Sequence, residues 1–274
     1  MPSKYLSSAI EIAREAGQLI LSIYQHGDFE RSIKADDTPV TSADLAAHQH
    51  ICQRLQVLTP DIPVLSEEAA AIPLHERARW PRYWLVDPLD GTQEFIAGSG
   101  DFATIIALID NHRPVMGVVY APVSDVVYYA CQGEGAFKTN GEGTLPISTH
   151  THRHNSRNIA VAISRRQDID AITNRLDPAW NYHLVPLGSA ALKACLVAEG
   201  AVDCYLRLGP TGEWDTAATQ CIVEEAGGRI LNTHLQPLSY NLRETLENPN
   251  FITLGDETLP WSDILTPDNR LLES

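Results

Sequence analysis

Two aspartates, Asp87 and Asp90, close the apolar run in the stretch "WLVDPLDGT". Anions this close repel each other, and burying them costs several kcal/mol unless a positive charge compensates. Pro88 stiffens the turn between them, so both carboxylates and the carbonyl group of Leu89 can point at one position. Oxygen ligands of this kind suit Mg²⁺ better than zinc. The stretch therefore indicates a site for a hard divalent cation.

Two further acidic motifs have the same character, because in each of them an acid adjoins apolar residues. The motif "VLSEE" ends a predicted strand with Glu67 and Glu68, and "GEWDTAA" places Asp215 at the opening of a predicted helix. Each motif also has a simpler interpretation. Asp215 could cap its helix, the two glutamates could form a solvated first turn, and the "DPLD" aspartates could form an ordinary turn. Three such motifs in one chain favour a shared metal site.

Gly91 and Thr92 follow the second aspartate directly. If "TQEFIAG" forms a short helix, the backbone N–H groups of these two residues lie at its N-terminus. That position is suited to a phosphate oxygen. Metal-binding acids followed by a phosphate site indicate chemistry on a phosphate ester.

The hydrophobic pattern predicts the elements that must bring these motifs together. Apolar residues recur at helical spacing near the N-terminus, and a second helix is predicted from Ser42 to Leu58, with Thr41 or Ser42 as its N-cap. Strands are predicted over "IPVLSEE" and "YWLV", and then over "FATIIALID", "PVMGVVYAP", "DVVYYACQ" and "GAFKTNG". The stretch "GEGTLP" is predicted to be a turn. After residue 158, strands and helices alternate.

This order of elements predicts an α/β (α+β) layered sandwich with two subdomains. Residues 1–153 would form an α+β subdomain that carries most of the metal ligands, and residues 154–274 an α/β subdomain that completes the site. The boundary is placed in the segment from His150 to Asn158, because it has no apolar periodicity.

The composition excludes some classes of partner. The chain has 274 residues and a formal net charge of −15, which argues against nucleic acid or an anionic membrane as a general partner. No apolar run approaches the roughly 20 residues of a membrane span. The five cysteines have neither metal-ligand nor redox spacing. They are expected to be buried thiols in a reducing cytoplasm.

Several longer motifs carry a resemblance to a known family. They are "PVTSADLAAH", "PVLSEE", "RYWLVDPLDGT", "LIDNHRPVMGVVYAPV", "CLVAEG", "GPTGEWDTAA" and "ENPNF", and they run from about residue 38 to residue 251. With them the chain resembles the inositol monophosphatase superfamily of Mg²⁺-dependent, lithium-sensitive phosphatases. Within that superfamily it looks most like the bacterial 3′(2′),5′-bisphosphate nucleotidases. The resemblance implies an inositol monophosphatase or fructose-1,6-bisphosphatase-like fold.

The resemblance also implies a set of metal ligands and catalytic residues. Two or three Mg²⁺ ions would be held by Glu67, Asp87, Asp90, Asp215 and the carbonyl group of Leu89. A water activated by these ions would attack phosphorus in line, oriented by Glu67 and the Thr92 hydroxyl group. Asp44 would polarise Thr92. No covalent enzyme intermediate is expected.

The substrate implied by the resemblance is adenosine 3′,5′-bisphosphate, a by-product of sulfur assimilation that would be hydrolysed to AMP and phosphate. Lys193, in "SAALKACL", and Arg207, in "YLRLGP", match positions that hold the 5′-phosphate in relatives, and Ser189 would assist. The scissile phosphate would lie against Gly91, Thr92 and Asp215. Without the resemblance, Lys193 would be an exposed helix residue and Arg207 a surface strand residue.

Three departures from the family pattern concern the substrate. Gln93 stands where relatives often have the lysine of "DGTKEF", and Gln167 where they often have a histidine that contacts the nucleotide. The stretch "GSAALK" is one residue longer than the "GSSLK" of close relatives, which leaves the role of Ser189 open. All of the predicted metal ligands are intact.

Other interpretations of the sequence remain open. Inositol monophosphate or fructose 1,6-bisphosphate could be the substrate, and an inactive metal-binding homologue would carry the same acids. A haloacid-dehalogenase mechanism is disfavoured, because its D-x-D-G-T loop spaces the acids by two whereas Asp87 and Asp90 are three apart. A monomer or homodimer in the cytoplasm is predicted. The resemblance also leaves open a peripheral location on the cytoplasmic face of the inner membrane.

Overall fold

Two long helices form one outer layer of the protein. The structure is a computed structural model that describes residues 2–27, 29–33, 39–151 and 156–265. Helix α1 spans Leu6–His26 and follows the short η1 (Pro2–Tyr5), and α2 spans Ser42–Leu58. Both long helices are predicted by the hydrophobic pattern. The Thr41 side chain accepts a hydrogen bond from the Ala43 amide, so Thr41 is the N-cap of α2.

The first sheet has seven strands in the order β3-β4-β5-β6-β7-β8-β9. They are β3 (Val64–Ser66), β4 (Arg82–Asp90), β5 (Ala103–Asp110), β6 (Arg113–Ala121), β7 (Val126–Cys131), β8 (Ala136–Asn140) and β9 (Gly143–Ile147). Strands β3 and β4 are parallel, and the remaining neighbours are antiparallel. The prediction of a turn over "GEGTLP" is right for Gly141 and Glu142, which join β8 to β9, and wrong from Gly143 on, where β9 begins. An exposed edge strand lacks the apolar alternation on which that prediction depended.

The second sheet has five strands in the order β11-β10-β12-β14-β13. They are β10 (Asn158–Ser164), β11 (Asn181–Leu187), β12 (Cys204–Arg207), β13 (Arg229–Asn232) and β14 (Phe251–Leu254). Four helices pack on its two faces: α5 (Ile169–Thr173), α6 (Ala190–Ala198), α7 (Glu213–Glu225) and α8 (Trp261–Ile264). Strand β14 and helix α8 carry no pattern that predicts them.

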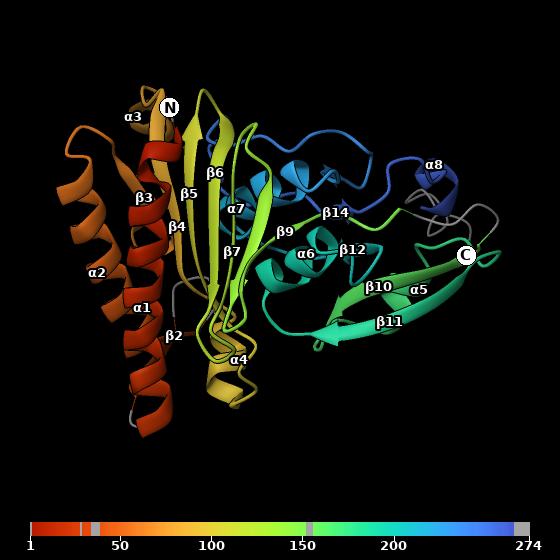
Figure 1. The fold of residues 1–274 in the computed structure, drawn as a ribbon, viewed down its shortest axis with the longest axis horizontal. Helices are drawn as coiled ribbons and strands as arrows, with labels where there is room; N and C mark the ends of the chain where they lie inside the picture. The colour runs from red at the N-terminus through yellow and green to blue at the C-terminus, as the bar shows by residue number, and fades with distance from the viewer. Residues whose placement is uncertain (1, 28, 34–38, 152–155, 266–274) are drawn as a thin grey trace.

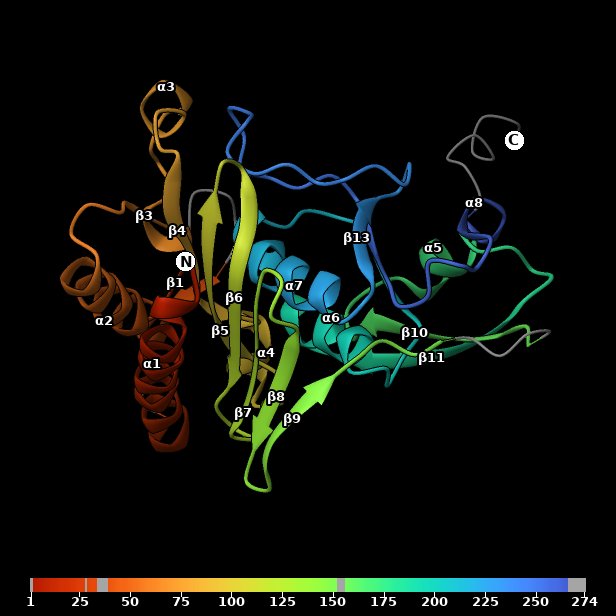
Figure 2. The same cartoon turned by 45° about the horizontal axis from the view of Figure 1, so that its top comes forward.

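The elements stack in five layers (Figure 1). Helices α1 and α2 cover the outer face of the first sheet, α6 and α7 lie between the two sheets, and α5 and α8 lie beyond the second sheet. Figure 2 shows α6 and α7 in the same central position after rotation. Side chains alternate along β4, so Trp84 and Val86 pack toward α1 and α2 whereas Tyr83 and Leu85 face the central layer.

Short elements lie around the ends of β3 and β4. They are η2 (Glu67–Ala69), α3 (Leu74–Arg77), α4 (Thr92–Ala97) and the two-stranded pair β1 (Arg31–Ile33) and β2 (Pro39–Thr41). Because η2 follows β3 directly and α4 follows β4 after a single residue, both acidic motifs of the first half emerge at the same end of the sheet.

Gly117 in β6 marks the closest approach of α7 to the first sheet. A Cβ atom added at Gly117 would lie 2.1 Å from the carbonyl oxygen of Ala218 in α7. Gly117→Ala is therefore expected to lower the free energy of unfolding by about 1–3 kcal/mol through overpacking, as measured by urea denaturation. The control is Gly141→Ala in the β8–β9 turn, where an added Cβ meets no atom within 4 Å. Equal losses in the two variants would contradict the packing argument.

The predicted division into subdomains stays a prediction. Its boundary, between residues 153 and 154, lies outside the described residues. Helix α7 belongs to the predicted C-terminal subdomain, yet it packs on β5 and β6 of the first sheet. Among the helices that the structure describes, none combines the length and the hydropathy that a membrane span requires.

Candidate active site

Three carboxylates from two distant parts of the chain meet where the end of β4 lies near the start of α7. Side-chain oxygen atoms of Asp87, Asp90 and Asp215 lie within 4.8 Å of one another. Residues three apart in a regular strand point to opposite faces, so Asp87 and Asp90 would diverge. The pairing of β4 with β5 shifts register between these two residues. This irregularity re-aims the chain and lets both carboxylates converge.

Asp215 reaches the same point from the first turn of α7. Its carboxylate accepts a hydrogen bond of 2.6 Å from the Gly212 amide, at the helix N-terminus. The simple interpretation of Asp215 as a capping residue therefore describes one of its contacts, and the acidic cluster is the other. A single carboxylate can do both because it has two oxygen atoms.

The acidic cluster is electrostatically unfavourable by itself. Burial raises the pKa of Asp87 well above its ordinary value, and the negative charges of Glu67 and Asp90 raise it further. Burial and the charges of Asp90 and Glu67 raise the pKa of Asp215 in the same way. As anions, these groups need a cation among them. All of the donors are oxygen atoms, which fits a hard divalent cation such as Mg²⁺.

Glu67 and Leu89 lie beside the three aspartates. Glu67 begins η2 directly after β3, and its side chain interacts with Asp87. The Leu89 carbonyl oxygen accepts a hydrogen bond of 3.2 Å from the Thr92 hydroxyl group. The five predicted metal ligands all line one cavity of about 860 Å³. Their roles as ligands stay predictions, but the structure brings them together.

Gly91 and Thr92 begin α4 at the edge of this cavity. Gly91 has a φ of +94°, and a Cβ atom there would lie 2.9 Å from the carbonyl oxygen of Asp101, so only glycine fits. The Thr92 hydroxyl group donates a hydrogen bond of 2.9 Å to Asp44. Asp44 is buried and also accepts hydrogen bonds from the amide and hydroxyl groups of Thr41, at 2.7 and 2.6 Å. The pairing of Asp44 with Thr92 that the resemblance implies is thus present.

The N-terminus of α6 binds Asp90. The amides of Ala190 and Ala191 donate to the Asp90 carboxylate at 3.2 and 2.8 Å, and the Ser189 hydroxyl group also donates to it. Such donors stabilise an anion at a helix start. Ser189 also accepts a hydrogen bond of 3.0 Å from the Leu192 amide. Its predicted contact with substrate stays a prediction. No sequence motif predicts the two alanine amides, because backbone donors carry no residue signature.

Lys193 is buried, with 2% of its surface exposed, so its interpretation as an exposed helix residue is wrong. Its ammonium group donates to the carbonyl oxygens of Leu187, Gly188 and Ser189, at 3.3, 2.8 and 2.6 Å. Burial lowers the pKa of Lys193 to about 8. The lysine therefore holds the loop that leads into α6, at the wall of the cavity.

Arg207 ends β12 and lines the same cavity. One terminal nitrogen of its guanidinium group donates to the carbonyl oxygen of Pro210 at 3.0 Å. Its Nε atom is buried and has no hydrogen-bond partner within the part of the chain that the structure describes. Gln167 lines the same cavity, and its side-chain amide donates to the carbonyl oxygen of Leu208, the residue after Arg207, at 3.1 Å. A cation with donor capacity therefore lies in the cavity wall.

Arg166 is a further cation at the cavity, and the sequence motifs do not predict its place there. It lines the cavity, and its guanidinium group donates to the Glu94 carboxylate at 3.0 Å and to the Gln93 carbonyl oxygen at 3.2 Å. A positive charge therefore lies beside Gln93, although Gln93 itself is neutral. The available signal was the basic pair Arg165–Arg166 directly before Gln167. Only tertiary contact shows which side chain the second arginine reaches.

Comparisons with known proteins give the same picture. The model of the inositol monophosphatase family matches residues 1–257. The chain belongs to this family. Inositol monophosphatase family proteins are metal-dependent, and the acidic cluster of Asp87, Asp90 and Asp215 is compatible with metal binding.

Individual relatives within the inositol monophosphatase family cover nearly the whole chain. The 3'(2'),5'-bisphosphate nucleotidase CysQ of Aggregatibacter actinomycetemcomitans is 44% identical over 261 residues, which are 94% of this chain and 96% of the relative. The protein of the same name from Escherichia coli K12 is 42% identical over 249 residues, with 90% and 98% covered. These relatives confirm the resemblance found in the sequence motifs.

Solved structures confirm the predicted fold class. The crystal structure of CysQ from Bacteroides thetaiotaomicron, a bacterial member of the inositol monophosphatase family, is 38% identical with a TM-score of 0.77, covering 91% of this chain and 96% of that one. An IMPase from Thermotoga maritima is 26% identical with a TM-score of 0.76, and 91% of each chain is covered.

Proposed function

We propose that this protein is a metal-dependent 3′(2′),5′-bisphosphate nucleotidase that hydrolyses adenosine 3′,5′-bisphosphate to AMP and phosphate. The observation that carries the proposal is one cavity whose lining combines the converging acids Asp87, Asp90 and Asp215 with two cations, Lys193 and Arg207. Such a cavity suits a substrate with two phosphates, one cleaved at the cation site formed by the acids and the other bound by the basic side chains. The names of relatives at 40–44% identity support the same activity.

The proposed cofactor is two or three Mg²⁺ ions, with Glu67, Asp87, Asp90, Asp215 and the carbonyl group of Leu89 as ligands. When bound, the ions supply positive charge that neutralises the acids and polarises the scissile phosphate. The donor set supports this assignment, since carboxylate and carbonyl oxygens are the ligands that Mg²⁺ prefers.

The side chains around Thr92 are arranged to orient a water molecule. The one hydroxyl hydrogen of Thr92 is shared between Asp44 Oδ1 at 2.9 Å and the Leu89 carbonyl oxygen at 3.2 Å, so the Thr92 oxygen can present a lone pair to a water in the cavity. The carboxylate of Glu67 would accept a proton from that water as it attacks phosphorus, and the 3′-oxygen of the sugar would leave as the P–O bond breaks and take up a proton from solvent. The amides of Gly91 and Thr92, at the start of α4, would bind oxygens of the same phosphate.

The second phosphate would lie against Lys193 and Arg207. The hydrogen bonds of the Lys193 ammonium group go to three backbone carbonyls, so Lys193 would contribute charge and the shape of the loop rather than a new hydrogen bond. Arg207 would supply the direct hydrogen bonds, with Ser189 nearby. This division of roles is consistent with the planar, multidentate geometry of arginine.

The test compares phosphate release from adenosine 3′,5′-bisphosphate, 5′-AMP and inositol 1-phosphate, each with Mg²⁺ and with or without lithium. The bisphosphate is expected to be preferred by about 100-fold in kcat/KM, since charge-assisted hydrogen bonding of Arg207 to a second phosphate contributes about 3 kcal/mol. Lithium is expected to inhibit. Preference for inositol 1-phosphate would overturn the substrate and keep the metal chemistry, and no release from any substrate would indicate an inactive homologue.

The proposed location is the cytoplasm. The cysteines are free thiols, and four of the five are buried, which supports a reducing compartment. The proposed partner is the small nucleotide substrate. Whether the protein is a monomer or a homodimer stays a prediction.

A further inference from the structure

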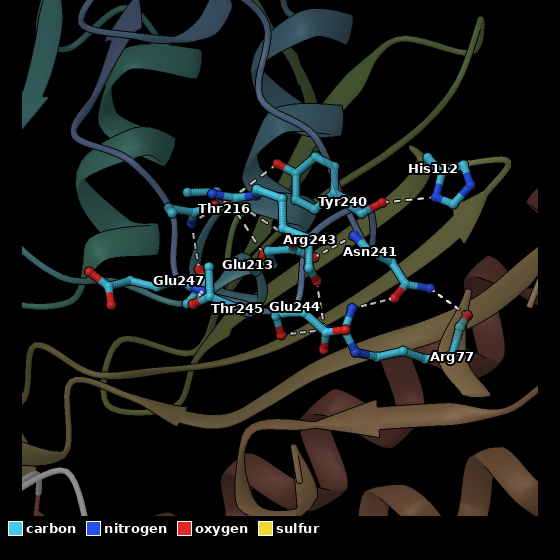
Figure 3. A network of polar contacts seen from close by, with 12 residues as sticks. Arg77, His112, Glu213, Thr216, Tyr240, Asn241, Arg243, Glu244, Thr245 and Glu247 are labelled. Atoms are coloured by element: carbon cyan, nitrogen blue, oxygen red, sulfur yellow. Dashed lines mark hydrogen bonds and ion pairs between the residues drawn. The ribbon is translucent and has the colours of Figure 1, made fainter. Parts of the chain in front are cut away.

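Buried polar residues connect α3 with the start of α7 (Figure 3). The connection runs through residues 240–248, here called the 240–248 segment. Residues 244–247 of this segment line the cavity. Helix α3 follows Glu67 in the chain, and Asp215 lies in the first turn of α7. The connection therefore joins the two segments that bring acids to the cluster from outside β4.

Arg77 anchors the α3 side of this connection. The residue is 1% exposed, and its guanidinium group donates to the carbonyl oxygens of Arg243 and Glu244 at 2.7 and 2.6 Å. It also donates to Ile72, at 3.0 Å, and so braces the loop between η2 and α3. A fully buried arginine with this many backbone contacts fixes the distance between the two segments that it joins, which here are the loop before α3 and the 240–248 segment.

Asn241 and Glu213 complete the connection on the α7 side. The Asn241 side chain accepts a hydrogen bond from the Arg77 guanidinium group at 2.6 Å and donates to the Arg77 carbonyl oxygen at 2.7 Å. Its backbone amide donates to Glu213 at 2.8 Å. Asn241 and Glu213 are both fully buried, and Figure 3 shows Asn241 between the other two residues.

The 240–248 segment also braces the start of α7 directly. The Glu213 amide donates to the carbonyl oxygen of Leu246 at 2.8 Å. The Asn248 side chain donates to the carbonyl oxygen of Gly212 at 2.6 Å, and the Gly212 amide in turn holds Asp215. Any displacement of the segment therefore moves the residues that orient Asp215.

We propose that Arg77, Asn241 and Glu213 are positioning residues that set the separation of Glu67 and Asp215, and thereby the affinity of the cation site. The acids of the cluster repel one another, so without this support they would move apart in the metal-free protein. Bringing them together again would then cost part of the free energy of cation binding. A rigid support keeps them at the spacing that a small cation needs. This inference rests on the cation site of the proposed function, but it does not depend on the identity of the substrate.

The test is Mg²⁺ binding to the metal-free protein, measured by isothermal titration calorimetry without substrate. Asn241→Gly removes both side-chain hydrogen bonds to Arg77, keeps the backbone amide for Glu213, and tolerates the φ of +57° at this position. It is expected to weaken Mg²⁺ binding about 10-fold, with kcat at saturating Mg²⁺ near that of the wild type. The control is Leu242→Ala, since the neighbouring Leu242 is 55% exposed.

Asn241→Asp is the second variant, in case the glycine variant does not fold. It keeps the shape and the acceptor for Arg77 but loses the donor to the Arg77 carbonyl oxygen. Its added negative charge would by itself strengthen cation binding, so weaker binding would identify the lost bond as the cause. A lower Tm with unchanged Mg²⁺ affinity in both variants would overturn the inference alone. A wild-type protein that binds no Mg²⁺ would overturn the cation site as well.

Discussion

Asp87→Asn is expected to lower kcat for phosphate release by about 1,000-fold, because it removes a central charge from the proposed cation site. The same change is expected to stabilise the metal-free protein by about 1 kcal/mol, a rise in Tm of roughly 2–4 °C. Asp87 is buried, and both its burial and the neighbouring acids destabilise the ionised form of its carboxyl group. Asparagine retains an oxygen that can accept the 3.0 Å hydrogen bond from the Leu89 amide.

Thermal unfolding with and without Mg²⁺, together with phosphate release, measures both effects. Saturating Mg²⁺ should raise the Tm of the wild type, since a ligand that binds the folded state stabilises it, and should leave the Tm of the variant nearly unchanged. Asp110→Asn is the control, because Asp110 lies at the opposite end of the β4–β5 pair in a partly exposed ion pair with Arg82. A variant with full activity, or with a lower Tm in the metal-free state, would contradict this account of the cluster.

Arg207→Gln is expected to raise KM for adenosine 3′,5′-bisphosphate by about 100-fold, the loss that follows from removing a charge-assisted hydrogen bond of about 3 kcal/mol. Glutamine keeps a side-chain donor for the Pro210 carbonyl oxygen but lacks the charge and the second donor direction. The Mg²⁺ concentration for half-maximal activity should not change, because Arg207 is not a proposed ligand.

Steady-state kinetics on the bisphosphate and on a monophosphate substrate distinguish this effect from general damage. The monophosphate has no second phosphate for Arg207 to bind, so its kcat/KM should stay within a few-fold of the wild type. Arg229→Gln is the matched control, since Arg229 lies in β13 of the same sheet and pairs with Glu257 at the surface. Equal losses on both substrates would show that Arg207 supports the fold rather than the second phosphate.

The sequence by itself determined the elements whose signal is local. The helical spacing of apolar residues predicts α1 and α2, and the capping preference of Thr41 or Ser42 predicts the start of α2. Strands β4 to β8 are long and apolar enough to be predicted directly from the sequence. The site acids could also be identified from the sequence, because burying a carboxylate beside an apolar strand costs free energy and therefore indicates a compensating positive charge. The family motifs extended this reading to the fold and the reaction.

Only the tertiary structure decided which groups meet. Asp87 and Asp90 converge because β4 is irregular between them. Pro88 favours an irregularity at this point, but only the pairing of β4 with β5 shows the register shift itself. Asp90 is bound by two amides of α6 that lie about a hundred residues away in the chain. The side chains of Lys193 and Arg77 are buried although their residue types favour the surface, because backbone carbonyls supplied by the fold satisfy them. Local propensity acts over a few residues, whereas these contacts depend on packing between segments that are distant in the chain. A single sequence does not show which distant segments pack together.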